Sequence, residues 1–97
     1  MAEIIWTDPA LQSLDEIADY ISLYDIKAAR NLVKDVFSTV ELLERQPNLG
    51  KKIPELDTSI YREIIVVPCR IFYRIEDKSL FIVSVQRQEQ MFRNPFF

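Results

Sequence analysis

The fold of this chain is decided by residues 61–87, which read YREIIVVPCRIFYRIEDKSLFIVSVQR. β-Branched and aromatic residues are frequent in this stretch, and they favour extended strands. Pro68-Cys69 interrupts the stretch once, and Glu76 to Ser79 interrupts it again. Short runs joined by tight turns predict three consecutive strands in an antiparallel meander.

The middle strand, 70–75, is predicted to have two faces of opposite character, because successive side chains of a strand point to opposite sides. One face carries Arg70, Phe72 and Arg74, and the other carries Ile71, Tyr73 and Ile75. We expect the Ile-Tyr-Ile face to pack against helices. The arginine face is then expected to stay open.

The first half of the chain changes to a helical period. Residues 3–6 predict a short first strand. Asp8 followed by Pro9 predicts a helix start, because an Asp side chain accepts from free amides and proline at the first helical position loses no hydrogen bond. Apolar residues recur at steps of three and four over 11–24 and over 29–43, which predicts two amphipathic helices. The break near Tyr24-Asp25 is short, so the helices are expected to form an antiparallel hairpin.

Together these elements predict an α+β fold of order β-α-α-β-β-β. A helical hairpin packs on one face of a mostly antiparallel four-stranded sheet. Residues 51–59 are expected to be a loop, and Cys69 is expected to lie in a turn. The chain is expected to be a single domain, 1–97, with 88–97 as a C-terminal tail.

Histidine is absent from the 97 residues, and cysteine occurs once. This excludes the usual imidazole bases, the common Ser-His and Cys-His nucleophiles and most zinc sites, so no metal or cofactor is predicted. A lone cysteine forms no internal disulfide, and the first residues show no secretory pattern. The longest apolar run, 64–67, is far too short to cross a bilayer. We therefore expect a cytoplasmic protein that does not enter a membrane.

Charge divides the chain into two halves. Residues 1–49 carry nine acids and four bases, whereas residues 50–97 carry six acids and eight bases. One interpretation is that the strand arginines converge on the open sheet face and bind an anionic partner. These arginines are Arg62, Arg70, Arg74 and Arg87. The alternative is that they are ordinary strand arginines paired with Glu63, Glu76 and Glu89.

The tail adds Arg93 and the aromatic residues Phe92, Phe96 and Phe97. These rings either fold back on the sheet or form an exposed apolar patch of the kind that marks a binding site. Arg93, Phe96 and Phe97 therefore join the strand arginines as candidate target-binding residues. A net charge of −3 argues against free nucleic acid as a direct ligand.

The order of several motifs carries a family resemblance. Arg62-Glu63 precedes an apolar strand, the pattern Arg-Ile-x-Tyr-Arg occupies 70–74, and Ile82-Val83-Ser84-Val85 follows. Along almost the whole chain, this order resembles the RelE/ParE superfamily of bacterial toxins. The resemblance implies the toxin of a type II toxin-antitoxin system, associated with growth arrest and plasmid stabilisation. It also implies a small cognate antitoxin that wraps around the toxin and neutralises it.

The superfamily contains two main activities. RelE-like members cut mRNA in the ribosomal A site, with a basic sheet face and a tyrosine or histidine near the C-terminus. Arg70 matches an arginine of the family, but residues 86–92, QRQEQMF, contain neither of those two residue types. Gln86 stands where many ParE-like members carry histidine, and glutamine transfers no proton at a useful pH. The resemblance therefore implies the ParE branch, a non-enzymatic inhibitor of DNA gyrase that blocks replication.

Two other functions stay open at this point. The first is a RelE-like ribosome-dependent mRNA endonuclease, and the second is an inert remnant that only titrates the antitoxin. We expect the antitoxin to cover the helical hairpin, with addition to a sheet edge as a second docking mode. Nucleic acid is expected to be met only through the antitoxin. A homodimer or a larger toxin-antitoxin assembly is left open.

Overall fold

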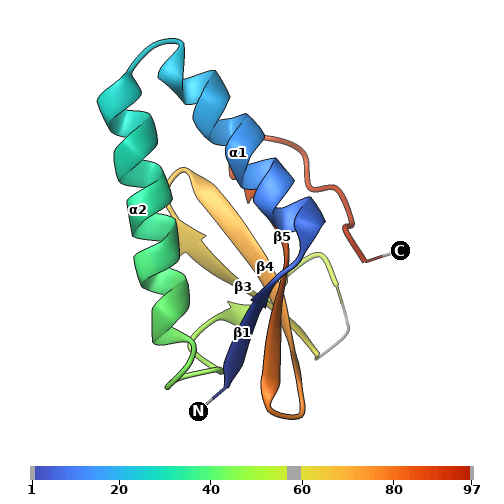
Figure 1. Cartoon of the computed structure of the whole chain (residues 1–97). Coiled ribbons are helices and arrows are strands. Elements are labelled where there is room, and N and C mark those ends of the chain that lie inside the picture. The colour runs from blue at the N-terminus through green and yellow to red at the C-terminus, as the bar shows by residue number, and fades with distance from the viewer. Residues whose placement is uncertain (1, 57–59, 97) are drawn as a thin grey trace.

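The computed structural model describes residues 2–56 and 60–96. They form β1 (Glu3–Trp6), α1 (Asp8–Ser22), α2 (Ile26–Leu42), β2 (Lys51–Lys52), β3 (Tyr61–Val66), β4 (Cys69–Glu76) and β5 (Ser79–Arg87). The strands make one five-stranded sheet in the order β1-β5-β4-β3-β2. β1 runs parallel to β5, and the other neighbours are antiparallel. The two helices form a hairpin in front of the sheet (Figure 1).

The predicted α+β fold, with a helical hairpin on one face of a mostly antiparallel sheet, is confirmed. The prediction of four strands is wrong, because β2 lies inside the segment expected to be a loop. It pairs Lys51 with Glu63 and Lys52 with Arg62. Two lysines carry no periodic apolar signal, so this strand exists only because β3 offers an edge to pair with.

The start of α1 differs from the prediction. Thr7, not Asp8, is the N-cap: its hydroxyl accepts from the amide of Ala10 at 3.4 Å and donates to the carbonyl of Ile82 at 2.7 Å. Asp8 is the first helical residue, where a negative charge still favours the helix N-terminus. The predicted break before α2 is confirmed.

The core lies between the helices and one face of the sheet. Leu14 of α1 and Val36 of α2 belong to the same buried cluster as Ile71 and Tyr73 of β4, so the predicted apolar face is confirmed. Cys69 is the first residue of β4 and is fully buried in this cluster. The expectation that it lies in a turn is therefore wrong. Of the two helices described, neither has the length and apolar character needed to span a membrane.

A bulge in β5 changes which of its side chains face the helices. Phe72 lies opposite Ser84, but the next residue, Tyr73, lies opposite Ile82. Val83 is therefore an extra residue in β5. Side chains after the bulge lie on the face opposite to the one that strict alternation would give them.

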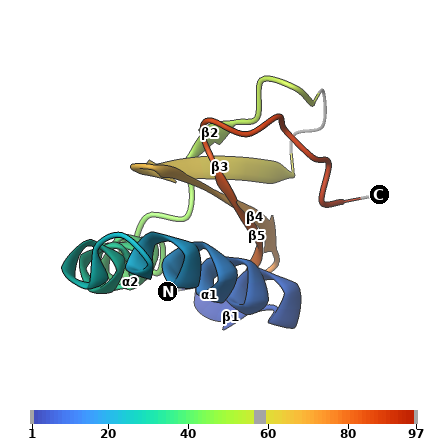
Figure 2. The ribbon, with the colours of Figure 1, turned by 90° about the horizontal axis from the view of Figure 1, so that it is seen from above.

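The second face of the sheet is covered by other segments of the chain. Figure 2 shows the helices on one side of β3 and β4, and the C-terminal tail on the other side. Phe72 lies on this second face and is nevertheless fully buried. The expectation that this face stays open is wrong, because the tail folds back over it.

Candidate functional site

The four strand arginines are divided between the two faces of the sheet. Arg70 and Arg74 lie on the face away from the helices. Arg62 is opposite the core residue Tyr73, and Arg87 follows the bulge, so both lie on the helix side. The prediction that all four converge on one face is wrong. Register and bulges set the face of each strand residue, and both depend on the neighbouring strand.

Arg62 and Arg87 each have a structural partner. Nη1 of Arg62 donates to the carbonyl oxygen of Gly50 at 2.8 Å. The guanidinium carbon of Arg87 lies 4.7 Å from the centre of the Tyr20 ring, and its Nη1 pairs with Glu89 at 3.0 Å. These contacts tie β3 to the segment after α2, and β5 to α1.

Arg70 lies at the centre of a charge cluster with Glu55 and Glu63. Its Nη1 and Nη2 donate to the two carboxylate oxygens of Glu55 at 3.0 and 2.8 Å, and Nη2 also donates to Glu63 at 2.5 Å. The side chain of Glu63 is 3% exposed and that of Arg70 is 12% exposed. The hydrogen bond from Arg70 holds the pKa of Glu55 below its ordinary value, and the same bond raises the pKa of Arg70.

The alternative that the strand arginines pair with glutamates is confirmed for three of the four, since Arg62 is bonded to the carbonyl of Gly50 instead. The pairs are Arg70 with Glu63, Arg74 with Glu76 and Arg87 with Glu89. No role was expected for Glu55, because it lies in a segment without periodic pattern and reaches Arg70 only through the fold. A target-binding role for the arginines stays a prediction.

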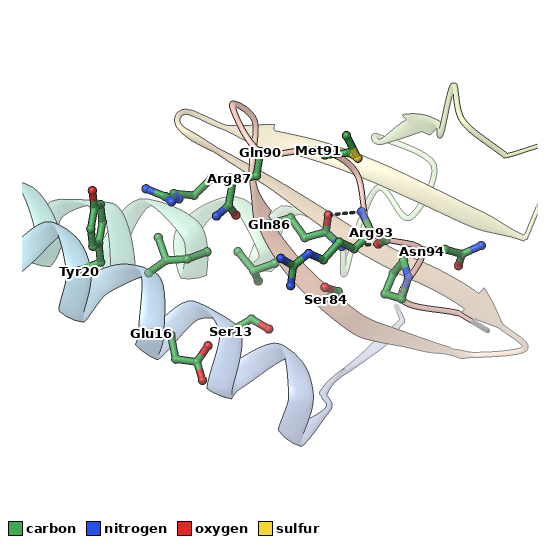
Figure 3. Close-up of a pocket in the computed structure, with 13 residues that line it drawn as sticks. Ser13, Glu16, Tyr20, Ser84, Gln86, Arg87, Gln90, Met91, Arg93 and Asn94 are labelled. Atoms are coloured by element: carbon green, nitrogen blue, oxygen red, sulfur yellow. Dashed lines mark hydrogen bonds between the residues drawn. The ribbon is translucent and has the colours of Figure 1, made fainter.

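Gln86 holds the C-terminal tail on the sheet. Its amide donates to the carbonyl of Arg93 at 2.6 Å and accepts from the amide of Arg93 at 3.1 Å (Figure 3). Two hydrogen bonds in opposite directions are what a residue exchanges with its partner in an antiparallel strand pair. The side chain of Gln86 therefore replaces a strand partner for the tail.

Aromatic rings of the tail complete this cover. Phe96 stacks on Tyr61 with ring centres 3.7 Å apart. Phe92 and Phe96 meet the ring of Phe72 edge-on, at 5.5 and 6.2 Å. The interpretation that the rings fold back on the sheet is confirmed for Phe92 and Phe96, and Phe97 lies outside the described residues.

A cleft of about 490 Å³ lies between α1 and the tail. Glu16 and Tyr20 line it from α1, and Arg87 and Arg93 line it from the end of β5 and from the tail (Figure 3). Two predicted target-binding residues are thus brought together here. The walls carry both signs of charge, so the cleft offers contacts to polar groups of either sign.

Two groups that could carry chemistry are buried. Burial raises the pKa of the Cys69 thiol to about 11, so the thiol is protonated at neutral pH and is a poor nucleophile. The Tyr73 hydroxyl donates to Pro47 and accepts from Gly50, both at 2.8 Å, and burial raises its pKa. Residues 2–56 and 60–96 contain no group of three or more Cys, Asp and Glu side chains placed to hold a metal ion.

The helical hairpin carries apolar surface of its own. One groove between the helices is lined by Leu11, Val33 and Phe37, and a second, beside it, is lined by Ala18, Ile26 and again Val33. At the tip of the hairpin, the side chains of Leu23 and Tyr24 are exposed.

Comparisons with known proteins identify the family and the fold. The model of the family described as "ParE toxin of type II toxin-antitoxin system, parDE" matches residues 4–92. A curated relative, Toxin RelE2 of Caulobacter vibrioides, is 29% identical over 92 residues, which cover 94% of this chain and 100% of that protein.

The solved structures that are similar to the chain include the following two. The structure titled "Chromosomal ParDE TA system from P. aeruginosa" has a TM-score of 0.73 and 27% identity, and covers 90% of this chain and 96% of its own. The YoeB dimer from Staphylococcus aureus has a TM-score of 0.60 and 20% identity, with 88% and 94% covered, and supports the fold. The expected RelE/ParE superfamily is confirmed. Because the family model matches nearly the whole chain, the chain belongs to the ParE toxin family of type II toxin-antitoxin systems.

Proposed function

We propose that this toxin arrests growth by binding DNA gyrase and trapping its complex with cleaved DNA, without catalysis of its own. A cognate antitoxin neutralises it. The family description and the similar structure of a ParDE system support this assignment to the ParE branch.

The proposal rests on the contacts of Arg70, whose guanidinium is already bonded to two carboxylates. Cleavage of RNA needs a group that stabilises charge on the scissile phosphate and a group that transfers a proton. Arg70 donates to two carboxylates, Glu55 and Glu63, and lies beneath the tail. The amide of Gln86, at the end of β5, does not titrate and is bonded to the tail. These groups favour a surface that binds a protein over a site that cuts RNA.

The proposed contact surface is the C-terminal tail together with the cleft beside α1. Arg62 is bonded to the backbone of Gly50, and the side chain of Arg70 is only 12% exposed. Arg74 and Arg87 are 30% and 21% exposed and pair with exposed glutamates. We therefore place the target contact at Arg74, Arg87, Arg93 and Phe96. The guanidinium of Arg74 also lies over the ring of Phe81. Arg93 is exposed beside the cleft.

Purified protein tests the proposal in DNA supercoiling and cleavage assays with gyrase. We expect inhibition of supercoiling and accumulation of cleaved DNA, both weakened by Arg93→Ala. Arg45→Ala, a change of an exposed arginine on the loop after α2, is the matched control. Absence of inhibition at a large molar excess would overturn the proposal.

A second candidate function is that of a ribosome-dependent mRNA endonuclease, which the name of the relative Toxin RelE2 supports. It predicts toeprint cleavage in a translating extract that vanishes with Arg70→Ala, provided that the variant is folded. An inert remnant predicts neither gyrase inhibition nor cleavage, and no growth arrest on expression without the antitoxin.

The grooves of the helical hairpin are the proposed antitoxin site. An amphipathic helix of the antitoxin fits an apolar groove between two helices, and Val33 lines both grooves. Val33→Asp is therefore expected to keep gyrase inhibition and to lose protection by the coexpressed antitoxin. Protection equal to that of the wild type would remove the hairpin from the interface.

A further inference from the structure

The sheet face beneath the tail has the composition of a surface for single-stranded nucleic acid. Lys51, Arg70 and Arg74 supply positive charge on this face, and Tyr61 and Phe72 supply aromatic rings. Proteins bind single strands by combining cationic groups, which meet the phosphates, with aromatic rings, which stack on the bases. In this chain the same groups are engaged by other parts of the molecule.

Glu55 takes the place that a phosphate would take on Arg70. Its two oxygens accept from Nη1 and Nη2 at 3.0 and 2.8 Å, which is the paired geometry in which arginine recognises carboxylates and phosphates alike. The tail occupies the aromatic surface in the same way. Phe96 stacks on the ring of Tyr61 with ring centres 3.7 Å apart, where a base would stack.

The two carboxylates on Arg70 differ in kind. Glu63 is a residue of β3 and its side chain is 3% exposed, whereas Glu55 lies on a loop and its side chain is 40% exposed. Glu63 alone neutralises Arg70, and the side chain of Lys51, 4.0 Å from Glu63, adds a positive charge. Glu55 cancels that remaining charge. Without Glu55, the cluster of Arg70, Lys51 and Glu63 would carry a net positive charge and would attract an anion.

We propose that Glu55 is a specificity-determining residue, which excludes single-stranded RNA from this face by occupying the guanidinium of Arg70 from within the chain. The inference rests on the proposed function, since it concerns how a gyrase-directed toxin would be kept from binding RNA on this face. Removal of Glu55 frees Nη1 of Arg70 completely and leaves Nη2 shared only with Glu63.

The test compares Glu55→Gln with Glu89→Gln in the full chain, with a fluorescein-labelled single-stranded RNA as probe and anisotropy as readout. The two substitutions change net charge equally, and each frees one arginine. Glu89→Gln removes the carboxylate that pairs with Arg87, which lies on the helix side of the sheet. We expect Glu55→Gln to tighten RNA binding by about tenfold and to add about 0.7 to the slope of log affinity against log salt, as for one added phosphate contact. Glu89→Gln is expected to bind as the wild type does.

Further variants keep the result interpretable. Glu55→Ala must tighten binding as Glu55→Gln does, and Arg70→Lys in the Glu55→Gln chain must reduce the gain, because lysine does not offer the paired geometry. Unchanged binding in both Glu55 variants overturns the proposal, and so does an equal gain in Glu89→Gln. Gyrase inhibition by the wild-type chain is measured separately, so a failure of the gyrase assay and a failure of the RNA assay are distinguishable.

Discussion

The hydroxyl of Tyr73 accepts a hydrogen bond from the amide of Gly50 at 2.8 Å. This bond joins the middle strand to the segment after α2, and the same hydroxyl donates to the carbonyl of Pro47 at 2.8 Å. A Cβ added to Gly50 would lie 2.5 Å from the hydroxyl and 2.6 Å from the backbone oxygen of Glu63. The single glycine of the chain is thus required by close approach.

Gly50→Ala is expected to destabilise the protein. The added methyl group meets a buried hydroxyl and a backbone oxygen, neither of which can move freely, so we expect a loss of about 1–3 kcal/mol of unfolding free energy. Urea denaturation measures it. Asn48→Ala, in the same segment and exposed, is the control and should change stability little. Equal stability of Gly50→Ala and the wild type would contradict the close approach.

Tyr73→Phe removes the hydroxyl that pairs with Gly50 and Pro47. We expect a loss of about 1–3 kcal/mol, because the buried amide of Gly50 and the half-buried carbonyl of Pro47 lose their partner. Tyr24→Phe, at an exposed tyrosine, should have almost no effect on the denaturation midpoint.

The same tyrosine predicts a pH dependence. Burial raises the pKa of Tyr73 above its ordinary value of 10.0, so the unfolded chain ionises first as pH rises. The contribution of Tyr73 is full below that value and is lost as pH climbs toward the folded-state pKa. Wild-type stability should therefore fall more steeply at alkaline pH than that of Tyr73→Phe. Parallel curves would contradict this.

Arg70→Ala is expected to cost about 3 kcal/mol of stability, because the buried carboxylate of Glu63 keeps only the exposed ammonium of Lys51, 4.0 Å away. The exposed fraction of the Glu63 side chain is 3%. Glu63→Gln in the same chain should recover part of the loss, since it removes the buried charge. A double variant no more stable than Arg70→Ala would show that packing of the arginine dominates.

The lowered pKa of Glu55 predicts how the stability of the protein changes at acid pH. The hydrogen bond from Arg70 causes this shift, so the contribution of Glu55 is present above the ordinary carboxyl value and is lost as pH falls through the folded-state pKa. Glu55→Gln should show a flatter loss of stability below about pH 4.5 than the wild type does. Thermal melts across that range measure it, with Glu16→Gln as the control at an exposed glutamate.

Gln86→Ala is expected to loosen the tail without unfolding the domain. It removes both hydrogen bonds to Arg93, so the Arg93 amide should exchange with solvent faster, and the loss of stability should stay within about 1.5 kcal/mol. Gln88→Ala, at an exposed glutamine, should leave exchange unchanged. Unaltered exchange in Gln86→Ala would mean that Phe92 and Phe96 hold the tail alone.

The strands, the helices and the apolar face of β4 could be predicted because each depends on residue types within a few positions of one another. Strand β2 could not be predicted, because Lys51 and Lys52 form a strand only by pairing with the edge that β3 supplies. The candidate site was less predictable than the fold. The sequence predicts seven candidate residues, but it does not show that the four strand arginines divide between the two faces of the sheet. It also carries no signal that Glu55 occupies Arg70.

The helical hairpin on a meander follows from local features of the sequence, since hydrophobic period and turn residues act between near neighbours. Packing of the elements against one another sets three further features: Arg62 and Arg87 face the helices, Glu55 reaches Arg70, and the tail covers Phe72. These features are not local, because a bulge at one residue reverses the faces of the residues that follow, and polar partners far apart in the chain meet only when strands have paired.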